Sequence, residues 1–256
     1  MTAQPSLVIA SKSPWDPPIR REHQLARLAM AANHRVSFVQ PPTDVRALRG
    51  SQPRAWLSQL IGAPRCWRYN GLEVVGRATL APAHVHRWLE PLETRSLARA
   101  IPEASALRPT IVATLPWHWP GVASARGYRR VLDVADDWSV LLPHRSRRIR
   151  EPYKQAAEEA EGITVVSDVL HGLFPERTVR TVRNGLDSAL LDRAISAPPR
   201  AQRLLYVGTL SERFDSILAG AILDELPAWR LDLYGACAYS RRGDQPGADL
   251  VELLQR

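Results

Sequence analysis

The sequence predicts an α/β protein whose first part is a doubly wound parallel sheet and whose last part begins a second unit of the same kind. Short apolar runs alternate with helix-like patterns along the chain, which is typical of parallel strands joined by crossover helices. A second strand–helix–strand series follows a connector that contains a Pro-Pro pair. We therefore expect a first domain over 1–190, a linker over 191–202 and a partial second domain over 203–256.

The first strand–helix–strand unit lies near the N-terminus. Residues 6–11 (SLVIAS) combine four apolar residues with small polar ones, which predicts a buried strand. Asp16 before Pro17 predicts the N-cap and first turn of a helix. Residues at helical spacing then form its expected apolar face: Leu25, Leu28, Ala29 and Ala32. A second strand is expected at 34–42, ended by prolines.

The later elements continue this alternation. Further strands are predicted at 109–116, 128–135, 162–167, 177–187, 203–208 and 230–235. Helical patterns occupy 85–101 with a break at Pro91, 147–161, 167–174 with Ser167 as cap, 216–226 and the final turns of the chain. Residues 67–76 predict two short strands about an Asn-Gly turn.

The composition is that of a globular protein with a strong basic bias. The chain has 256 residues, 45% of them hydrophobic, and a net charge of +8. Nucleic-acid binding is one interpretation of that charge. However, 32 of the 34 basic residues are arginines spread along the chain, which favours a GC-rich coding sequence as the cause. Attraction to an anionic membrane surface stays open.

Location and redox state follow from what the sequence lacks. No apolar run reaches the roughly 18 residues that cross a bilayer. The first residues carry no basic segment ahead of their short apolar run, so we expect no secretion signal. Cys66 and Cys237 are too far apart in sequence to indicate a disulfide framework or a zinc motif. We expect a cytoplasmic protein, with peripheral contact at the inner membrane face left open.

Six segments in a fixed order carry a family resemblance. They are PWDPPIRREHQLARLA, HRVSFVQPP, VLDVADDW, TVVSDVLHGLF, RTVRNGLD and LLYVGTLSERFD. Together they resemble bacterial glycosyltransferases of the GT-B fold, close to families 4 and 1. The run VVSDVLHGLF…NGLD is similar to the end of the N-terminal Rossmann-like domain in that group. The segment YVGTLSERFD is similar to the first strand and loop of its donor-binding domain. The resemblance spans 6–235.

The resemblance implies transfer of a sugar from a nucleotide-sugar donor to a saccharide or lipid-linked acceptor, with retention at the anomeric carbon. It also implies a role in cell-surface polysaccharide or glycoconjugate synthesis. The nucleotide sugar would be a substrate, and no cofactor is expected. The family's late Glu-x7-Glu element and its phosphate-loop lysine have no counterpart here. A truncated, non-catalytic acceptor-binding protein is therefore an alternative, and a basic nucleic-acid-binding protein is another.

The second domain carries the expected donor site. Gly208 follows a strand and precedes a helix, where a glycine lets the backbone approach a phosphate closely. Arg213 lies in the same loop, and its planar guanidinium suits a diphosphate. Thr209 completes this candidate set. The alternative is a surface arginine beside a tight turn.

Two adjacent acids after the strand at 128–135 raise the question of a catalytic pair, a metal site or a helix cap. Asp136 and Asp137 lie where the carboxyl end of a parallel strand faces the ligand crevice. They are not spaced as Asp-x-Asp, so no metal is expected. Either acid is a candidate catalytic or acceptor contact, and Trp138 a candidate sugar platform. The alternative, given equal weight, is that one Asp caps the next helix and that Trp138 packs in the core.

Further candidates lie in other loops. His118 follows a strand end between two tryptophans and resembles a histidine often found there in the family, which makes it a catalytic candidate. Aromatic packing in a loop is the alternative. Trp15, Asp16 and Arg20 are candidate acceptor contacts, unless the PWDPP segment is only a rigid start to the helix. Asn184 in the NGLD run is assigned to the acceptor side by the resemblance.

Overall fold

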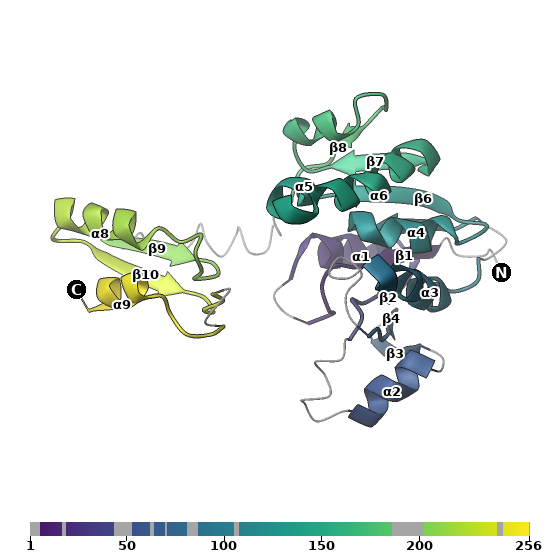
Figure 1. Ribbon diagram of the computed structural model, residues 1–256, viewed down its shortest axis with the longest axis horizontal. Coiled ribbons are helices and arrows are strands. Elements are labelled where there is room, and N and C mark those ends of the chain that lie inside the picture. The colour runs from purple at the N-terminus through teal and green to yellow at the C-terminus, as the bar shows by residue number, and fades with distance from the viewer. Residues whose placement is uncertain are drawn as a thin grey trace. The chain divides into compact units, whose positions relative to one another are not determined.

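A computed structural model of the chain describes residues 6–16, 19–43, 53–61, 64–69, 71–80, 87–104, 108–185, 202–239 and 243–255. The chain divides into two compact units, Met1–Gly185 and Leu186–Arg256. Each unit has its own sheet (Figure 1). The predicted linker at 191–202 lies outside the described residues, apart from Gln202.

The first unit is built on an eight-stranded sheet. Its strands are β1 (Ser6–Ala10), β2 (Arg35–Val39), β3 (Arg65–Tyr69), β4 (Leu72–Gly76), β5 (Thr110–Ala113), β6 (Arg129–Val134), β7 (Gly162–Val165) and β8 (Arg180–Thr181). Their order across the sheet is β3-β4-β2-β1-β5-β6-β7-β8. All neighbours are parallel except β3 and β4, which form the predicted hairpin. The strand order reverses at β1, because β2 lies on one side of it and β5 on the other.

Helices cover both faces of this sheet. They are α1 (Arg21–Ala31), α2 (Pro53–Ile61), α3 (Glu90–Ala100), α4 (Trp119–Ala123), α5 (Trp138–Leu141) and α6 (Ser146–Glu159). Short 3-10 helices lie at η2 (Arg87–Leu89), η3 (Pro116–His118), η4 (Pro143–Arg145) and η5 (Asp168–Leu173). Among the helices described, none combines the length and apolar character that a bilayer crossing requires.

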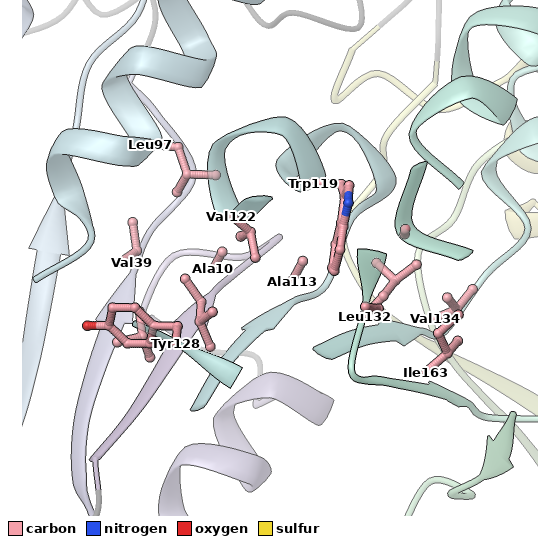
Figure 2. Packing of buried hydrophobic residues seen from close by; sticks show 14 of the residues in the cluster. Ala10, Val39, Leu97, Ala113, Trp119, Val122, Tyr128, Leu132, Val134 and Ile163 are labelled. Carbon is pink, nitrogen blue, oxygen red and sulfur yellow. The ribbon is translucent and has the colours of Figure 1, made fainter. Parts of the chain in front are cut away.

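The larger core lies between the sheet and helices α3, α4 and α6. Alternate strand residues point into it, including Val8 of β1 and Leu132 of β6. Trp119 of α4 is fully buried there, and Figure 2 shows it reaching down from the helix toward Ala113 and Leu132. Ile9, the residue between Val8 and Ala10, faces the opposite side, as the two-residue period of a strand requires.

A smaller core lies on that opposite face, under α1. Strands β1, β2 and β4 contribute Ile9, Phe38 and Val74, and the helix contributes Ala26. Toward β6 and β7 the same face becomes polar, because it carries Asp133 and Thr164 between core residues of the other face. Apolar helix packing thus gives way to a polar cluster on this side of the sheet.

The second unit is a parallel pair of strands with two helices. Its elements are β9 (Arg203–Val207), α8 (Ser216–Glu225), β10 (Arg230–Tyr234) and α9 (Ala248–Leu254). Its buried core consists of Leu210, Phe214, Tyr239, Leu250 and Leu253. Leu205 and Val207 of β9 are 64% and 73% exposed, so a two-stranded sheet leaves apolar surface uncovered, as expected.

The start of the first helix was predicted wrongly. The helix begins at Arg21 rather than after Asp16, and Arg20 is its N-cap. The backbone N–H of Arg20 donates to His23 Nδ1 at 3.1 Å, so the cap comes from within the helix. In the sequence, Asp16 and Pro17 each precede a proline, and residues before a proline disfavour helical geometry. The buried face of this helix also differs from the predicted one, since Leu28 is 69% exposed and Ala26 is buried instead.

Three further predictions differ from the structure. Ser167 precedes η5 but its side chain makes no capping hydrogen bond. The strand expected over 177–187 is reduced to Arg180–Thr181 at the edge of the sheet. Helix α2 was not predicted, although Pro53 at its first position is a common helix start.

Candidate functional site

The candidate site lies where the carboxyl ends of β1, β5 and β6 meet. This is the point at which the strand order reverses, and in open α/β sheets ligands bind there. The Ala10 carbonyl at the end of β1 accepts three hydrogen bonds. They come from the Thr114 N–H at 3.2 Å, the Thr114 hydroxyl at 2.8 Å and His118 Nδ1 at 3.1 Å. These bonds fasten the loop after β5 to the end of β1.

His118 is a buried member of this junction. Its side chain belongs to η3 and only 2% of the residue is exposed. Because a carbonyl oxygen only accepts, the contact with Ala10 requires that Nδ1 carries a proton. The ring therefore holds the loop in position, and a substrate has little direct access to it in this structure.

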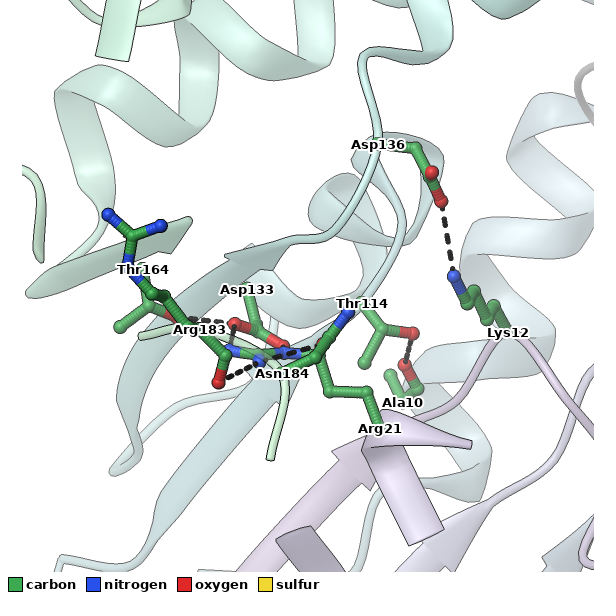
Figure 3. A network of polar contacts seen from close by, with 9 residues as sticks. All are labelled: Ala10, Lys12, Arg21, Thr114, Asp133, Asp136, Thr164, Arg183 and Asn184. Atoms are coloured by element: carbon green, nitrogen blue, oxygen red, sulfur yellow. Dashed lines mark hydrogen bonds and ion pairs between the residues drawn. The ribbon is translucent and has the colours of Figure 1, made fainter. Parts of the chain in front are cut away.

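Lys12 and Asp136 form an ion pair across the junction. Each lies two residues beyond its strand, Lys12 after β1 and Asp136 after β6, and β5 runs between these strands. The Lys12 ammonium donates to Asp136 Oδ2 at 3.2 Å (Figure 3). The side chain of Asp136 is 43% exposed, so the ion pair leaves part of this residue accessible to a ligand. A carboxylate held by a cation at a strand end is suited to orient a sugar hydroxyl.

The two adjacent acids have different surroundings. The Asp137 carboxylate accepts hydrogen bonds from the Ser139 N–H at 2.8 Å and the Ser139 hydroxyl at 2.6 Å, so it caps α5. Trp138 is partly buried and meets Trp117 edge to face, with 5.1 Å between ring centroids. Of the pair, Asp136 is the acid that pairs with Lys12 and is partly exposed, while Asp137 and Trp138 support the loop.

A polar cluster adjoins the crevice on the α1 side of the sheet. Arg21, the first residue of α1, grips Asp133 of β6 with two bonds: Nε to Oδ2 at 2.7 Å and Nη2 to Oδ1 at 2.9 Å. The Thr164 hydroxyl donates to the same carboxylate at 2.6 Å, and Arg21 Nη1 reaches the Asn184 side-chain oxygen at 3.3 Å (Figure 3). Hydrogen bonding to Asp133 raises the pKa of Arg21, so the guanidinium stays charged.

The remaining acceptor-side candidates divide between core and surface. Trp15 packs on Phe38 of the smaller core with 4.9 Å between ring centroids, and its backbone N–H donates to Gln40 Oε1 at 2.7 Å. Asp16 and Arg20 are exposed, and Arg20 starts α1. The structure thus gives Trp15 a packing contact and leaves the two charged side chains at the surface.

The donor-side candidates lie in the second unit, after β9. Gly208 donates its N–H to the Tyr234 carbonyl at 2.9 Å, and the Thr209 carbonyl accepts from the Tyr206 hydroxyl at 3.1 Å. A Cβ on Gly235 would lie 1.7 Å from the Gly208 carbonyl oxygen, so the two loops approach as closely as glycines permit. The Arg213 side chain is exposed in the same loop.

The structure brings together charged residues of the candidate site that the sequence prediction placed separately or did not include. Lys12, Arg21 and Asp133 were not predicted. Lys12 could have been found as one of only two lysines, placed just past a strand, and Asp133 as the lone acid within a buried strand. Within the described ranges, no group of three or more His, Cys, Asp or Glu side chains is arranged to hold a metal ion.

Comparison with known proteins finds structural but not sequence relatives. No model of a protein family matches the sequence. No curated protein matches it either. Among solved structures, one described as trehalose-6-phosphate from E. coli bound with UDP-2-fluoro glucose aligns with a TM-score of 0.60 at 11% identity, covering 98% of this chain and 68% of that one.

Two further structures align over the same extent. The protein Os79 from O. sativa in complex with UDP gives a TM-score of 0.55 at 14% identity, over 98% of this chain and 71% of that one. An alpha,alpha-trehalose-phosphate synthase (UDP-forming) from Burkholderia vietnamiensis gives a TM-score of 0.51 at 14% identity, over 98% of this chain and 67% of that one. These neighbours are GT-B glycosyltransferases. The likeness establishes the fold of this chain: α/β and GT-B-like, with one doubly wound unit followed by the first βαβ part of a second.

Proposed function

We propose that this protein transfers a sugar from a nucleotide-sugar donor to a hydroxyl of a saccharide or lipid-linked acceptor. The observation that carries the proposal is the Lys12–Asp136 pair at the point where the strand order reverses. Support comes from the fold, because structural neighbours are described as bound to UDP or a UDP sugar. A crevice of this kind binds small polar ligands in many α/β proteins.

On the acceptor side, Asp136 is proposed to contact the attacking hydroxyl. Its partly exposed carboxylate can accept a hydrogen bond from that hydroxyl and orient it, which is the positioning that transfer requires. Lys12 fixes the carboxylate, and His118 fixes the loop between them through Ala10. Asn184, held by Arg21, is proposed to line the acceptor side, with Asp16 and Arg20 as further surface contacts.

On the donor side, Arg213, Gly208 and Thr209 are proposed to bind the diphosphate. A leaving diphosphate needs cations or N–H groups that stabilise its developing charge. The N-terminus of α8 is already capped by Asp215, whose carboxylate accepts from the Leu218 N–H at 2.9 Å. The exposed guanidinium of Arg213 is therefore the principal candidate for this task.

The finer assignments extend the same proposal. The protein would belong with glycosyltransferase families 4 and 1, retain the anomeric configuration and use the nucleotide sugar as a substrate without a cofactor. A cytoplasmic place in polysaccharide or glycoconjugate synthesis, with peripheral contact at the inner membrane face, fits the sequence resemblance and the basic charge.

The test measures nucleoside diphosphate release from a panel of UDP, GDP and ADP sugars, with and without mixed saccharide acceptors. Asp136→Asn and Lys12→Met should each lower the rate by about 10² or more, as expected for loss of a positioned polar group. Glu103→Gln, an exposed acid away from the crevice, is the matched control. If none of the nucleotide sugars in the panel releases nucleoside diphosphate, the proposal is contradicted. Saturable acceptor binding without turnover would instead support the non-catalytic alternative.

A further inference from the structure

A cavity in the first unit has no lining residue in common with the Lys12–Asp136 site. It encloses about 260 Å³ beside the carboxyl end of β4, between α2 and α3. Gln59 of α2 and Ser96 of α3 contribute to its walls, together with Arg77, Arg95 and Arg99. Strand β2 separates β4 from β1, and none of these residues belongs to the Lys12–Asp136 site.

Arg77 is one of the residues that line this cavity, and two of its side-chain donors, buried in the wall, are unsatisfied. The residue is 1% exposed, and its Nε donates to the Gln40 carbonyl at 3.2 Å. Nη2 forms an ion pair with Glu93 Oε1, and the 3.7 Å between the two atoms is too long for a hydrogen bond. Both Nη1 and Nη2 lack a hydrogen-bond partner within the described part of the chain. Buried donors are nearly always paired in native proteins, so these two indicate a missing acceptor.

Burial does not neutralise this guanidinium. Desolvation lowers the pKa of Arg77 to about 10, while Glu93 opposes that shift. The side chain therefore stays protonated at neutral pH and carries its charge into the cavity wall. A buried charge with unmet hydrogen bonds is costly, and an anion that accepts from both Nη atoms would remove that cost.

Arg95 and Arg99 provide the rim of the same cavity. They stand four residues apart on α3, which puts them on one face of the helix, and both are exposed. The structure gives neither side chain an ion pair to a described residue. Two exposed guanidiniums thus line the cavity, a third is buried in its wall, and the described acidic neighbour of that third one is Glu93. The positive charge exceeds the negative charge at this place.

We propose that this cavity binds a phosphate-class oxoanion, either inorganic phosphate or a phosphate monoester. A phosphate dianion offers three oxygens to three guanidiniums and matches their planar, bidentate donor geometry. A carboxylate offers only two oxygens and one charge. Because the Nη atoms of Arg77 are sealed from solvent, the proposal requires that neighbouring side chains move before the ligand reaches them.

The test is calorimetric titration of the full chain with inorganic phosphate and, separately, with glucose 6-phosphate. A third arm measures cosedimentation with phosphatidylcholine vesicles that contain phosphatidic acid. The rim variant carries Arg95→Gln and Arg99→Gln. The control carries Arg27→Gln and Arg129→Gln, two exposed arginines elsewhere, so the net charge of both variants is equal. Since both pairs are exposed, we expect all proteins to fold.

The expected result is saturable binding that weakens by about tenfold or more in the rim variant and stays unchanged in the control. Arg77→Met should abolish it, and circular dichroism checks that this variant is folded. Binding of the soluble phosphates identifies a metabolite-type ligand, and binding of vesicles alone identifies a lipid headgroup. Equal weakening in rim and control variants, or no binding in any arm, would overturn the proposal. The glycosyl-transfer assay is independent of this outcome.

Discussion

Replacing Arg21 with Met should destabilise the first unit, because it leaves the buried carboxylate of Asp133 without its cation. The side chain of Asp133 is 8% exposed and that of Arg21 is 18% exposed, so water replaces the lost cation poorly. The variant removes the two bonds of 2.7 and 2.9 Å from Arg21 to Asp133 and leaves only the Thr164 hydroxyl on the carboxylate. Methionine keeps most of the apolar volume, so the effect is electrostatic.

Removing one partner of a buried ion pair costs about 3–5 kcal/mol. The partial exposure of Arg21 and the remaining Thr164 bond place this case at the lower limit, about 3 kcal/mol. For a unit of this size, each kcal/mol lowers Tm by about 2–4 °C, so we expect a fall of about 6–12 °C. Substituting both partners, Arg21→Met with Asp133→Leu, should recover part of the loss because no buried charge is left unpaired.

The assays are urea unfolding, which gives the free energy of unfolding, and thermal unfolding, which gives Tm, both followed by tryptophan fluorescence. Seven of the eight tryptophans lie in the first unit, so the signal reports mainly on that unit. Lys154→Met is the control, since it breaks an ion pair with Glu151 in which both side chains are at least 70% exposed. Such surface pairs contribute about 0–1 kcal/mol. If Arg21→Met is no more destabilising than Lys154→Met, the reasoning from burial is refuted.

Three further predictions concern other parts of the chain. Trp119→Ala should lower the unfolding free energy by about 3–5 kcal/mol in urea titrations, because the ring is fully buried; a loss under about 1 kcal/mol would contradict this. Gly235→Ala should disrupt the second unit, since its Cβ would meet the Gly208 carbonyl oxygen at 1.7 Å; unchanged amide NMR shifts in that unit would speak against it. The Thr181 hydroxyl, aided by a nearby arginine, holds the pKa of Asp168 below its ordinary value of 3.8. Because the folded pKa is depressed, this stabilisation is present above that value and is lost as the pH falls through the folded pKa. Thr181→Val should raise the Asp168 pKa in an NMR titration, and an unmoved pKa would exclude the bond's influence.

Most strands could be predicted because a buried strand is a local signal. The apolar runs in β1, β2, β5, β6 and β7 all coincide with observed strands. Helix ends were less predictable, since α1 begins where His23 can accept from the Arg20 N–H and not where the first capping residue occurs. Helix α2 has nine residues, fewer than the window of about 11–18 over which helical periodicity is judged.

The candidate site was only partly predictable because its contacts join distant segments. The rule that strand ends face ligands predicted the loop after β6 as part of the site. It did not predict which of the two acids in that loop would be accessible to a ligand. Asp137 lies where the N–H groups of Ser139 and Val140 need an acceptor, and Asp136 is left for Lys12. That partner is 124 residues away in the sequence, and no local pattern connects the two.

The sequence by itself determined the α/β class, the doubly wound first unit and the start of a second, because alternating apolar runs have few ways to be buried. It also determined that polar residues would gather at the ends of particular strands. Only the tertiary structure decided the strand order, and with it that Lys12 meets Asp136 and Arg21 meets Asp133. The physical reason is that periodicity specifies which face of a strand is buried, whereas the partner of a charged side chain depends on which strands become neighbours.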